Sequence, residues 1–159
     1  VGAGKITASL LELNQGVDDT LFTFPIPAGA AVVPLADLEP PSLSMEEASA
    51  LADFAVLTPA YLPAAARLEG INEVRGAVVQ RYRLPDDASF TIAQGTDSAA
   101  GSPAGAEGST VTVRGLDGTL YQDDDGSRTL LTWSDGLVTF WIGGDLTAET
   151  ALEIANSLN

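Results

Sequence analysis

Short apolar segments separated by Asp-Gly pairs fill the C-terminal third of the chain, and this spacing strongly limits how the chain can fold. The pairs are Asp117-Gly118, Asp125-Gly126 and Asp135-Gly136. Asp-Gly supplies the positive φ angles that tight hairpin turns require. Around these turns lie four predicted strands, at residues 110–114, 119–122, 129–133 and 137–142. The pattern therefore predicts an antiparallel meander.

A hairpin is predicted ahead of this meander. Its strands are residues 77–84 and 89–94, and Pro85-Asp86-Asp87 supplies the turn between them. Residues 95–109 are mostly Gly, Ser, Ala and Pro, which predicts a loop between the hairpin and the meander.

Two segments have the apolar spacing of amphipathic helices. Ser44 and Glu47 fit a capping box, which marks the start of the first helix. Its apolar positions are Ala48, Leu51, Ala52 and Ala55. The second helix follows Asp145, and its apolar stripe is Ala151, Ile154, Ala155 and Leu158. Both sets recur at the spacing of one helix face.

The predicted meander has an apolar face that needs a cover. Its large apolar residues are Leu131, Trp133, Val138, Phe140 and Ile142. The two amphipathic helices are the only predicted elements able to cover them. The sequence therefore predicts an α+β fold: a single antiparallel meander sheet with two helices packed on one face.

The N-terminal part is predicted to be a separate hairpin. Residues 5–13 and 21–24 are predicted strands, and a Pro-rich stretch from Pro34 to Pro41 follows them. A lone hairpin is only marginally stable in water, so it is expected either to dock on the sheet or to form a homodimer through residues 5–24. The predicted parts of the chain are residues 1–36, a linker at 37–43, and an α+β domain at 44–159.

The composition excludes several classes of partner. The formal net charge is −15, from 22 acidic and 7 basic residues. Such a surface repels nucleic acid phosphates and anionic lipid headgroups, so neither is an expected partner. No apolar run approaches the roughly 18 residues of a membrane helix, so no direct membrane span is predicted.

The composition also argues against catalysis. The chain has neither histidine nor cysteine, which removes the commonest general base, the thiol nucleophile and the commonest ligands of transition metals. The adjacent carboxylates Asp18-Asp19 and Asp86-Asp87 lie in predicted turns, and turn propensity explains them. The protein is therefore expected not to be an enzyme and to have no catalytic residues, no cofactor and no metal.

Whether the turn at residues 123–127 binds calcium is left open by the sequence. The densest acidic cluster is Asp123-Asp124-Asp125, in front of Gly126-Ser127. Oxygen ligands on a turn are suited to calcium, but the cluster lacks the alternating acids and the distant glutamate of a calcium loop. The favoured interpretation is a solvated hairpin tip.

Four residues are candidates for ligand binding. Arg81 and Arg83 lie on one face of a predicted strand, beside Tyr82, in a chain with few cations. Guanidinium groups are suited to anionic partner groups, although the two arginines could simply offset the acids of the chain. By strand parity Trp141 lies opposite Phe140 and Ile142, so it is expected on the outer face unless a loop covers it.

Two stretches of sequence resemble known families of exported bacterial proteins. Asn14-Gln-Gly-Val-Asp-Asp-Thr-Leu-Phe-Thr-Phe24, with Pro27-Ala-Gly29-Ala-Ala-Val32, resembles the last hairpin of LolA-like and RseB/MucB-like lipoprotein-carrier domains. The segments Leu57–Pro63, Thr132–Gly136 and Ile154–Leu158 are similar to the DUF4367 domain, over about residues 43–159. The first resemblance implies that residues 1–36 are the tail of a truncated half-barrel, whose lipid cavity is incomplete in this chain.

These resemblances imply an extracytoplasmic location, in the periplasm or on the cell surface. An anchor to the membrane through a segment ahead of Val1 is compatible with this expectation. The expected function is a non-catalytic binding, regulatory or sensing module of a bacterial cell-envelope protein, with a protein or a lipidated ligand as its partner. The alternative is the C-terminal piece of a lipid or lipoprotein carrier.

Overall fold

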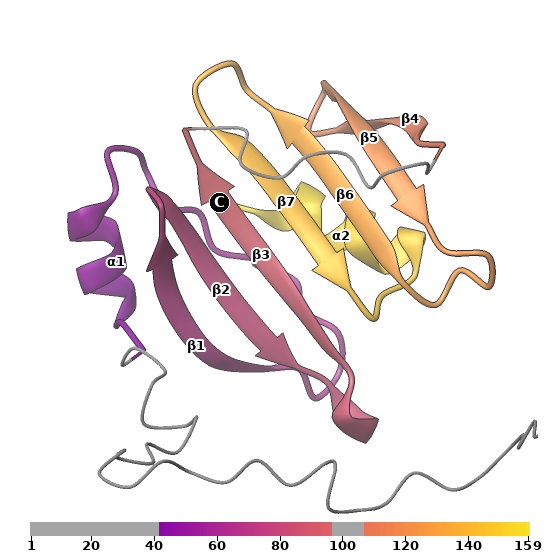
Figure 1. The fold of residues 1–159 in the computed structure, drawn as a ribbon, viewed down its shortest axis with the longest axis horizontal. Helices are drawn as coiled ribbons and strands as arrows, with labels where there is room; N and C mark the ends of the chain where they lie inside the picture. Colours follow the sequence, from indigo (N-terminus) through magenta and orange to yellow (C-terminus); the bar gives the residue numbers. More distant parts are fainter. Residues whose placement is uncertain (1–41, 97–106) are drawn as a thin grey trace, which may run out of the picture. The chain divides into compact units, whose positions relative to one another are not determined.

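The computed structural model describes residues 42–96 and 107–159, which contain seven strands and two α-helices (Figure 1). The strands are β1 (Arg67–Val74), β2 (Ala77–Arg83), β3 (Ser89–Gly95), β4 (Ser109–Val113), β5 (Leu116–Gln122), β6 (Thr129–Ser134) and β7 (Thr139–Gly144). The helices are α1 (Met45–Leu51) and α2 (Ala148–Ser157), and a short 3-10 turn, η3 (Pro85–Asp87), joins β2 to β3.

All seven strands form one antiparallel sheet, in the order β1-β2-β3-β7-β6-β5-β4. The predicted antiparallel sheet is therefore confirmed, as are the six predicted strands from residue 77 onward. It consists of two meanders, β1-β2-β3 and β4-β5-β6-β7, which meet where β3 pairs with β7. The chain thus crosses from the middle of the sheet to its far edge between β3 and β4.

One face of the sheet forms the core. Pairing across the strands places one row of side chains directly side by side on this face. The row is Ile71, Gln80, Ile92, Ile142, Leu131 and Leu120, and every member is buried. The alternating pleat of the strands explains the row, because residues two apart in each strand point to the same face.

Both helices cover this core face, as predicted. Ala48 of α1 packs with Ile71 and Val78 at one end of the sheet. The α2 helix lies behind β6 and β7 in Figure 1, and its stripe of Ala151, Ile154, Ala155 and Leu158 is buried as predicted. Each helix begins at a side-chain cap, which is Ser44 with Glu47 for α1 and Thr147 for α2.

The first helix is shorter than predicted. It ends at Leu51, so Ala55 lies outside it, and Leu51 is 61% exposed although its spacing predicted a buried position. Beyond Ala52 the chain continues as a segment without regular secondary structure, which packs on the core face of the sheet. The packing of the partly buried Phe54 and Leu57 against the core explains why the helix ends there.

This segment is held at Leu57 by two buried glutamines, Gln80 and Gln94. Gln94 donates to the Leu57 carbonyl at 2.6 Å and accepts from the Leu57 N–H at 2.8 Å. Gln80 donates to the same carbonyl at 2.9 Å and accepts from the Tyr82 hydroxyl. Buried polar groups need such partners, so we call Gln80, Gln94 and Leu57 the glutamine clasp.

The turns differ in part from the prediction. Asp125-Gly126 and Asp135-Gly136 lie in hairpin turns, and both glycines have positive φ. Asp117-Gly118 instead lies within β5, and the β4–β5 turn is Arg114-Gly115, with φ of 53° and 82°. Gly118 serves close packing, because a Cβ there would lie 3.0 Å from the Thr132 carbonyl oxygen.

The predicted N-terminal hairpin at residues 5–24 and most of the predicted linker at 37–43 lie outside the described residues. The predicted loop at 95–109 is described only at its ends, and Ser109 already belongs to β4. Neither helix of the described part of the chain is long and apolar enough to cross a membrane.

Candidate binding groove on the outer face

The second face of the sheet, which we call the outer face, is not covered by any helix of the described residues. Its middle row across the strands is Asn72, Val79, Ala93, Trp141, Thr132 and Thr119. Most of these side chains are small and partly exposed. Charged residues lie at one end of this face, over β1 and β2.

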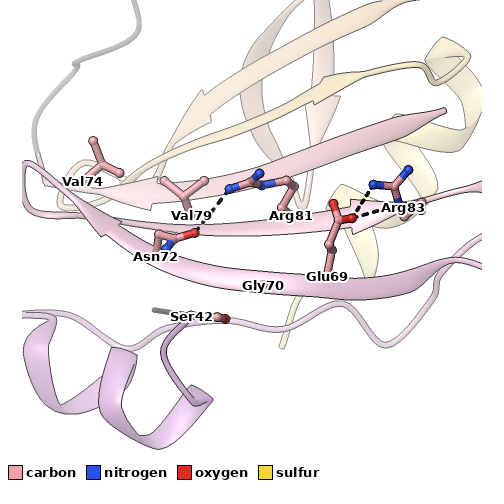
Figure 2. Close-up of a pocket in the computed structure, with 8 residues that line it drawn as sticks. All are labelled: Ser42, Glu69, Gly70, Asn72, Val74, Val79, Arg81 and Arg83. Carbon is pink, nitrogen blue, oxygen red and sulfur yellow. Dashed lines mark hydrogen bonds and ion pairs between the residues drawn. The ribbon is translucent and has the colours of Figure 1, made fainter. Parts of the chain in front are cut away.

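The outer face has a groove of about 560 Å³ over β1 and β2 (Figure 2). Its lining residues are Ser42, Glu69, Gly70, Asn72, Val74, Val79, Arg81 and Arg83. Gly70 leaves room beside Ser42, since a Cβ at Gly70 would lie 3.1 Å from the Ser42 Oγ. The groove thus combines two guanidinium groups with two valines.

Arg81 is exposed and makes no ion pair among the described residues. Its Nη2 atom donates to the Asn72 Oδ1 atom at 3.5 Å, across the β1–β2 pair (Figure 2). At that length the hydrogen bond is weak. Most of the donors of Arg81 are therefore available to a ligand.

Arg83 is held in place by two carboxylates. Its Nε atom donates to Glu69 Oε1 at 2.9 Å, and its Nη1 atom lies 3.3 Å from Asp87 Oδ1. The hydrogen bond and the charge of Glu69 raise the pKa of Arg83 above its ordinary value. Because the pair is largely exposed, it orients the guanidinium more than it stabilises the fold.

Tyr82 does not line the groove, so the structure does not bring it together with Arg81 and Arg83. Strand alternation turns its side chain to the core face, where it is 3% exposed and stacks on Phe90 with ring centroids 4.8 Å apart. Its hydroxyl donates to Gln80 of the glutamine clasp. Burial raises the pKa of Tyr82 to about 12, so it stays neutral at physiological pH.

Trp141 lies on the outer face, as its parity predicted, but it is not an exposed anchor. It pairs with Ala93 on β3 and Thr132 on β6, whereas Trp133 stacks on Phe140 in the core. Only 6% of Trp141 is exposed. Trp141 also lies outside the groove lining, so the structure does not bring it together with Arg81 and Arg83.

The sequence interpretation missed the groove residues contributed by β1 and by Ser42. The β1 segment, Arg-Leu-Glu-Gly-Ile-Asn-Glu-Val, is mostly polar and contains a glycine, so it lacks the alternation of a half-buried strand. The signal for it was the next turn, Arg75-Gly76, whose φ angles of 52° and 82° suit a two-residue hairpin.

The acidic tip, Asp123 to Asp125, is a hydrogen-bonded turn. The Ser127 N–H donates to the Asp125 carboxylate and the Ser127 hydroxyl donates to the Asp123 carboxylate. The Arg128 N–H also donates to Asp123. The Ser127 hydrogen bonds lower the pKa of Asp125. No group of three potential metal-ligating side chains occurs in residues 42–96 and 107–159.

Removing divalent ions should leave the stability of the protein unchanged, because Ser127 and Arg128 already donate hydrogen bonds to the carboxylates of the acidic tip. We expect the melting temperature in excess EDTA to equal that in buffer with added calcium or zinc. A shift of several degrees on chelation would show that a bound metal stabilises the fold.

The chemistry of the groove suits the capture of an anion. A guanidinium keeps its charge at all physiological pH values, and its planar donors match carboxylate and phosphate oxygens. Val74 and Val79 offer apolar contact beside these donors.

Comparison with known proteins identifies a family. The model of the family described as "Domain of unknown function (DUF4367)" matches residues 56–158. No curated protein and no solved structure matches the chain significantly. The family match spans β1 to β7 and α2, and therefore most of the groove, while Ser42 and α1 lie ahead of it. The chain belongs to the DUF4367 family.

Proposed function

We propose that this domain is a non-catalytic binding or sensing module whose ligand docks in the outer groove. The observation that carries the proposal is the position of Arg81. It is an exposed cation on a sheet face that no described helix covers, and it makes no ion pair among the described residues in a chain of net charge −15. The guanidinium of Arg81 lies beside two valines and is not neutralised by the many acids of the chain. This part of the groove suits a ligand that has an anionic group next to an apolar part.

The proposed setting is the cell envelope, outside the cytoplasm. Its support is the resemblance of residues 14–32 to the last hairpin of LolA-like and RseB-like domains. The non-catalytic role is supported separately by the lack of cysteine and histidine. The proposed partner is accordingly a protein or a lipidated ligand of the envelope. The runner-up function is the C-terminal piece of a lipid or lipoprotein carrier, which Val74 and Val79 in the groove favour.

Reversing the charge of Arg81 should strongly weaken ligand binding. We expect Arg81→Glu to reduce the bound fraction at least about tenfold, because the anionic group loses a charge-assisted hydrogen bond and meets a carboxylate. The measurement is native mass spectrometry of the protein purified from its own host. Arg75→Glu is the matched control, since Arg75 is exposed beside the groove but does not line it.

The mass of the bound species distinguishes the two functions. A stoichiometric protein supports the binding module, and a copurified lipid supports the carrier. A ligand that is retained equally by the parent, Arg81→Glu and Arg75→Glu would show that the groove is not the site.

A further inference from the structure

The two edges of the sheet are protected very differently. The β1 edge is covered at its centre, because the Leu43 N–H donates to the Ile71 carbonyl at 2.7 Å and the Ile71 N–H donates to the Ser42 Oγ at 2.8 Å. The strand also carries Arg67, Glu69 and Glu73 and a bulge between Leu68 and Gly70. Coverage, charge and bulges are the usual protections of an edge strand against pairing with another chain.

The β4 edge has none of these protections among the described residues. Its sequence, Ser-Thr-Val-Thr-Val, is uncharged and rich in β-branched residues, and it has a neighbouring strand on one side only. Its register with β5 is regular from Ser109 to Val113. Ser109, Thr110 and Thr112 are exposed.

The β4–β5 turn determines which backbone groups point to this edge. Arg114 and Gly115 both have positive φ, so they form a two-residue hairpin turn, in which the flanking Val113 and Leu116 exchange their hydrogen bonds. Alternation then turns the N–H and C=O groups of Thr110 and Thr112 away from β5. Within residues 42–96 and 107–159 no backbone group pairs with them, so they form a short open ladder.

We propose that this ladder pairs with the same strand of a second copy, so that two sheets join through antiparallel β4 strands. A two-fold axis normal to the sheet at Val111 places Thr110 opposite Thr112 of the other copy, and their unpaired backbone groups then face each other. Cross-strand threonine pairs are favourable.

The charges that flank β4 suit a second copy. Glu107 precedes the strand and Arg114 follows it, and both are exposed. Antiparallel pairing brings the acidic end of each strand diagonally next to the basic end of the other. The net charge of −15 opposes association at long range, so the dimer is stronger at 0.3 M salt than at 0.05 M, where the Debye length is longer.

Proline at position 112 tests the pairing without disturbing the monomer. The Thr112 N–H points to the open edge, so Thr112→Pro removes a donor that β5 does not use. By symmetry the dimer loses this hydrogen bond twice, and the association constant falls roughly tenfold to hundredfold. Sedimentation velocity on the full chain measures the shift from twice the 16.3 kDa chain mass to the single mass. The melting temperature of the dilute variant controls for folding.

A single introduced thiol tests the register. The chain has no cysteine, so any disulfide joins two copies. In the proposed dimer the two Val111 Cα atoms face each other across the axis at about 4.5 Å, within disulfide range. The two Ser109 Cα atoms are about 13 Å apart, which is too far for a disulfide. Val111→Cys should form a disulfide dimer under mild oxidation and Ser109→Cys should not. A parent chain that stays monomeric at high concentration, equal association of Thr112→Pro and parent, or equal cross-linking of the two thiols would overturn the proposal.

Discussion

Replacing Ile154 with alanine should lower the free energy of unfolding by about 2–5 kcal/mol, the range of large-to-small substitutions at fully buried sites. Ile154 is completely buried at the centre of α2, in the cluster that joins this helix to β6 and β7. The substitution removes apolar contacts and leaves a cavity that a closely packed sheet cannot fill by relaxing. A urea titration of both proteins gives the difference.

Glu153→Ala is the control for this substitution. Glu153 is exposed on the same helix, so its loss should change stability by less than about 0.5 kcal/mol. An Ile154→Ala protein as stable as the parent would contradict the packing of α2 through this stripe.

Replacing Gln94 with leucine should cost about 2–4 kcal/mol, although the side chains have similar volumes and leucine is apolar. Gln94 is fully buried and bonds both the N–H and the carbonyl of Leu57. Gln80 still serves the carbonyl in the variant, but the Leu57 N–H is left unpaired beneath the sheet. Urea unfolding measures the loss, and amide hydrogen exchange at Leu57 should speed up strongly.

Gln122→Leu is the matched control for the clasp. Gln122 is an exposed residue at the end of β5, and its replacement should leave both stability and the exchange of Leu57 nearly unchanged. Unaltered protection of the Leu57 amide in Gln94→Leu would show that the clasp does not hold the segment beneath the sheet.

The sequence predicted the parts of the fold whose local signals agree with their burial. The α2 stripe and the strands β2, β3, β6 and β7 have apolar spacing that matches their positions in the sheet. The glutamine clasp was not predictable, because its hydrogen bonds join residues 37 or 23 positions apart in the chain. The pairing of β3 with β7 is likewise long-range, and local turn patterns favoured sequential neighbours.

The candidate site was predictable only in part, for similar reasons. The parity of Arg81 and Arg83 on one face follows from the period of a strand, and the structure places both in the groove. The same parity turns Tyr82 to the core face, so the strand period also separates Tyr82 from Arg81 and Arg83. Glu69, Asn72 and Ser42 reach the groove through the pairing of an atypical edge strand, which sequence periodicity does not reveal.

The most direct test of a ligand in the outer groove is site-specific photo-cross-linking in the host cell. A photoreactive phenylalanine analogue at Val74, which is 52% exposed in the groove, should yield a discrete cross-linked product. The same analogue at Leu51, a comparably exposed apolar position on α1, should yield none. Arg81→Glu should remove the Val74 product. Equal products from the two positions, or a product from Leu51 alone, would contradict the assignment of the groove as the binding site.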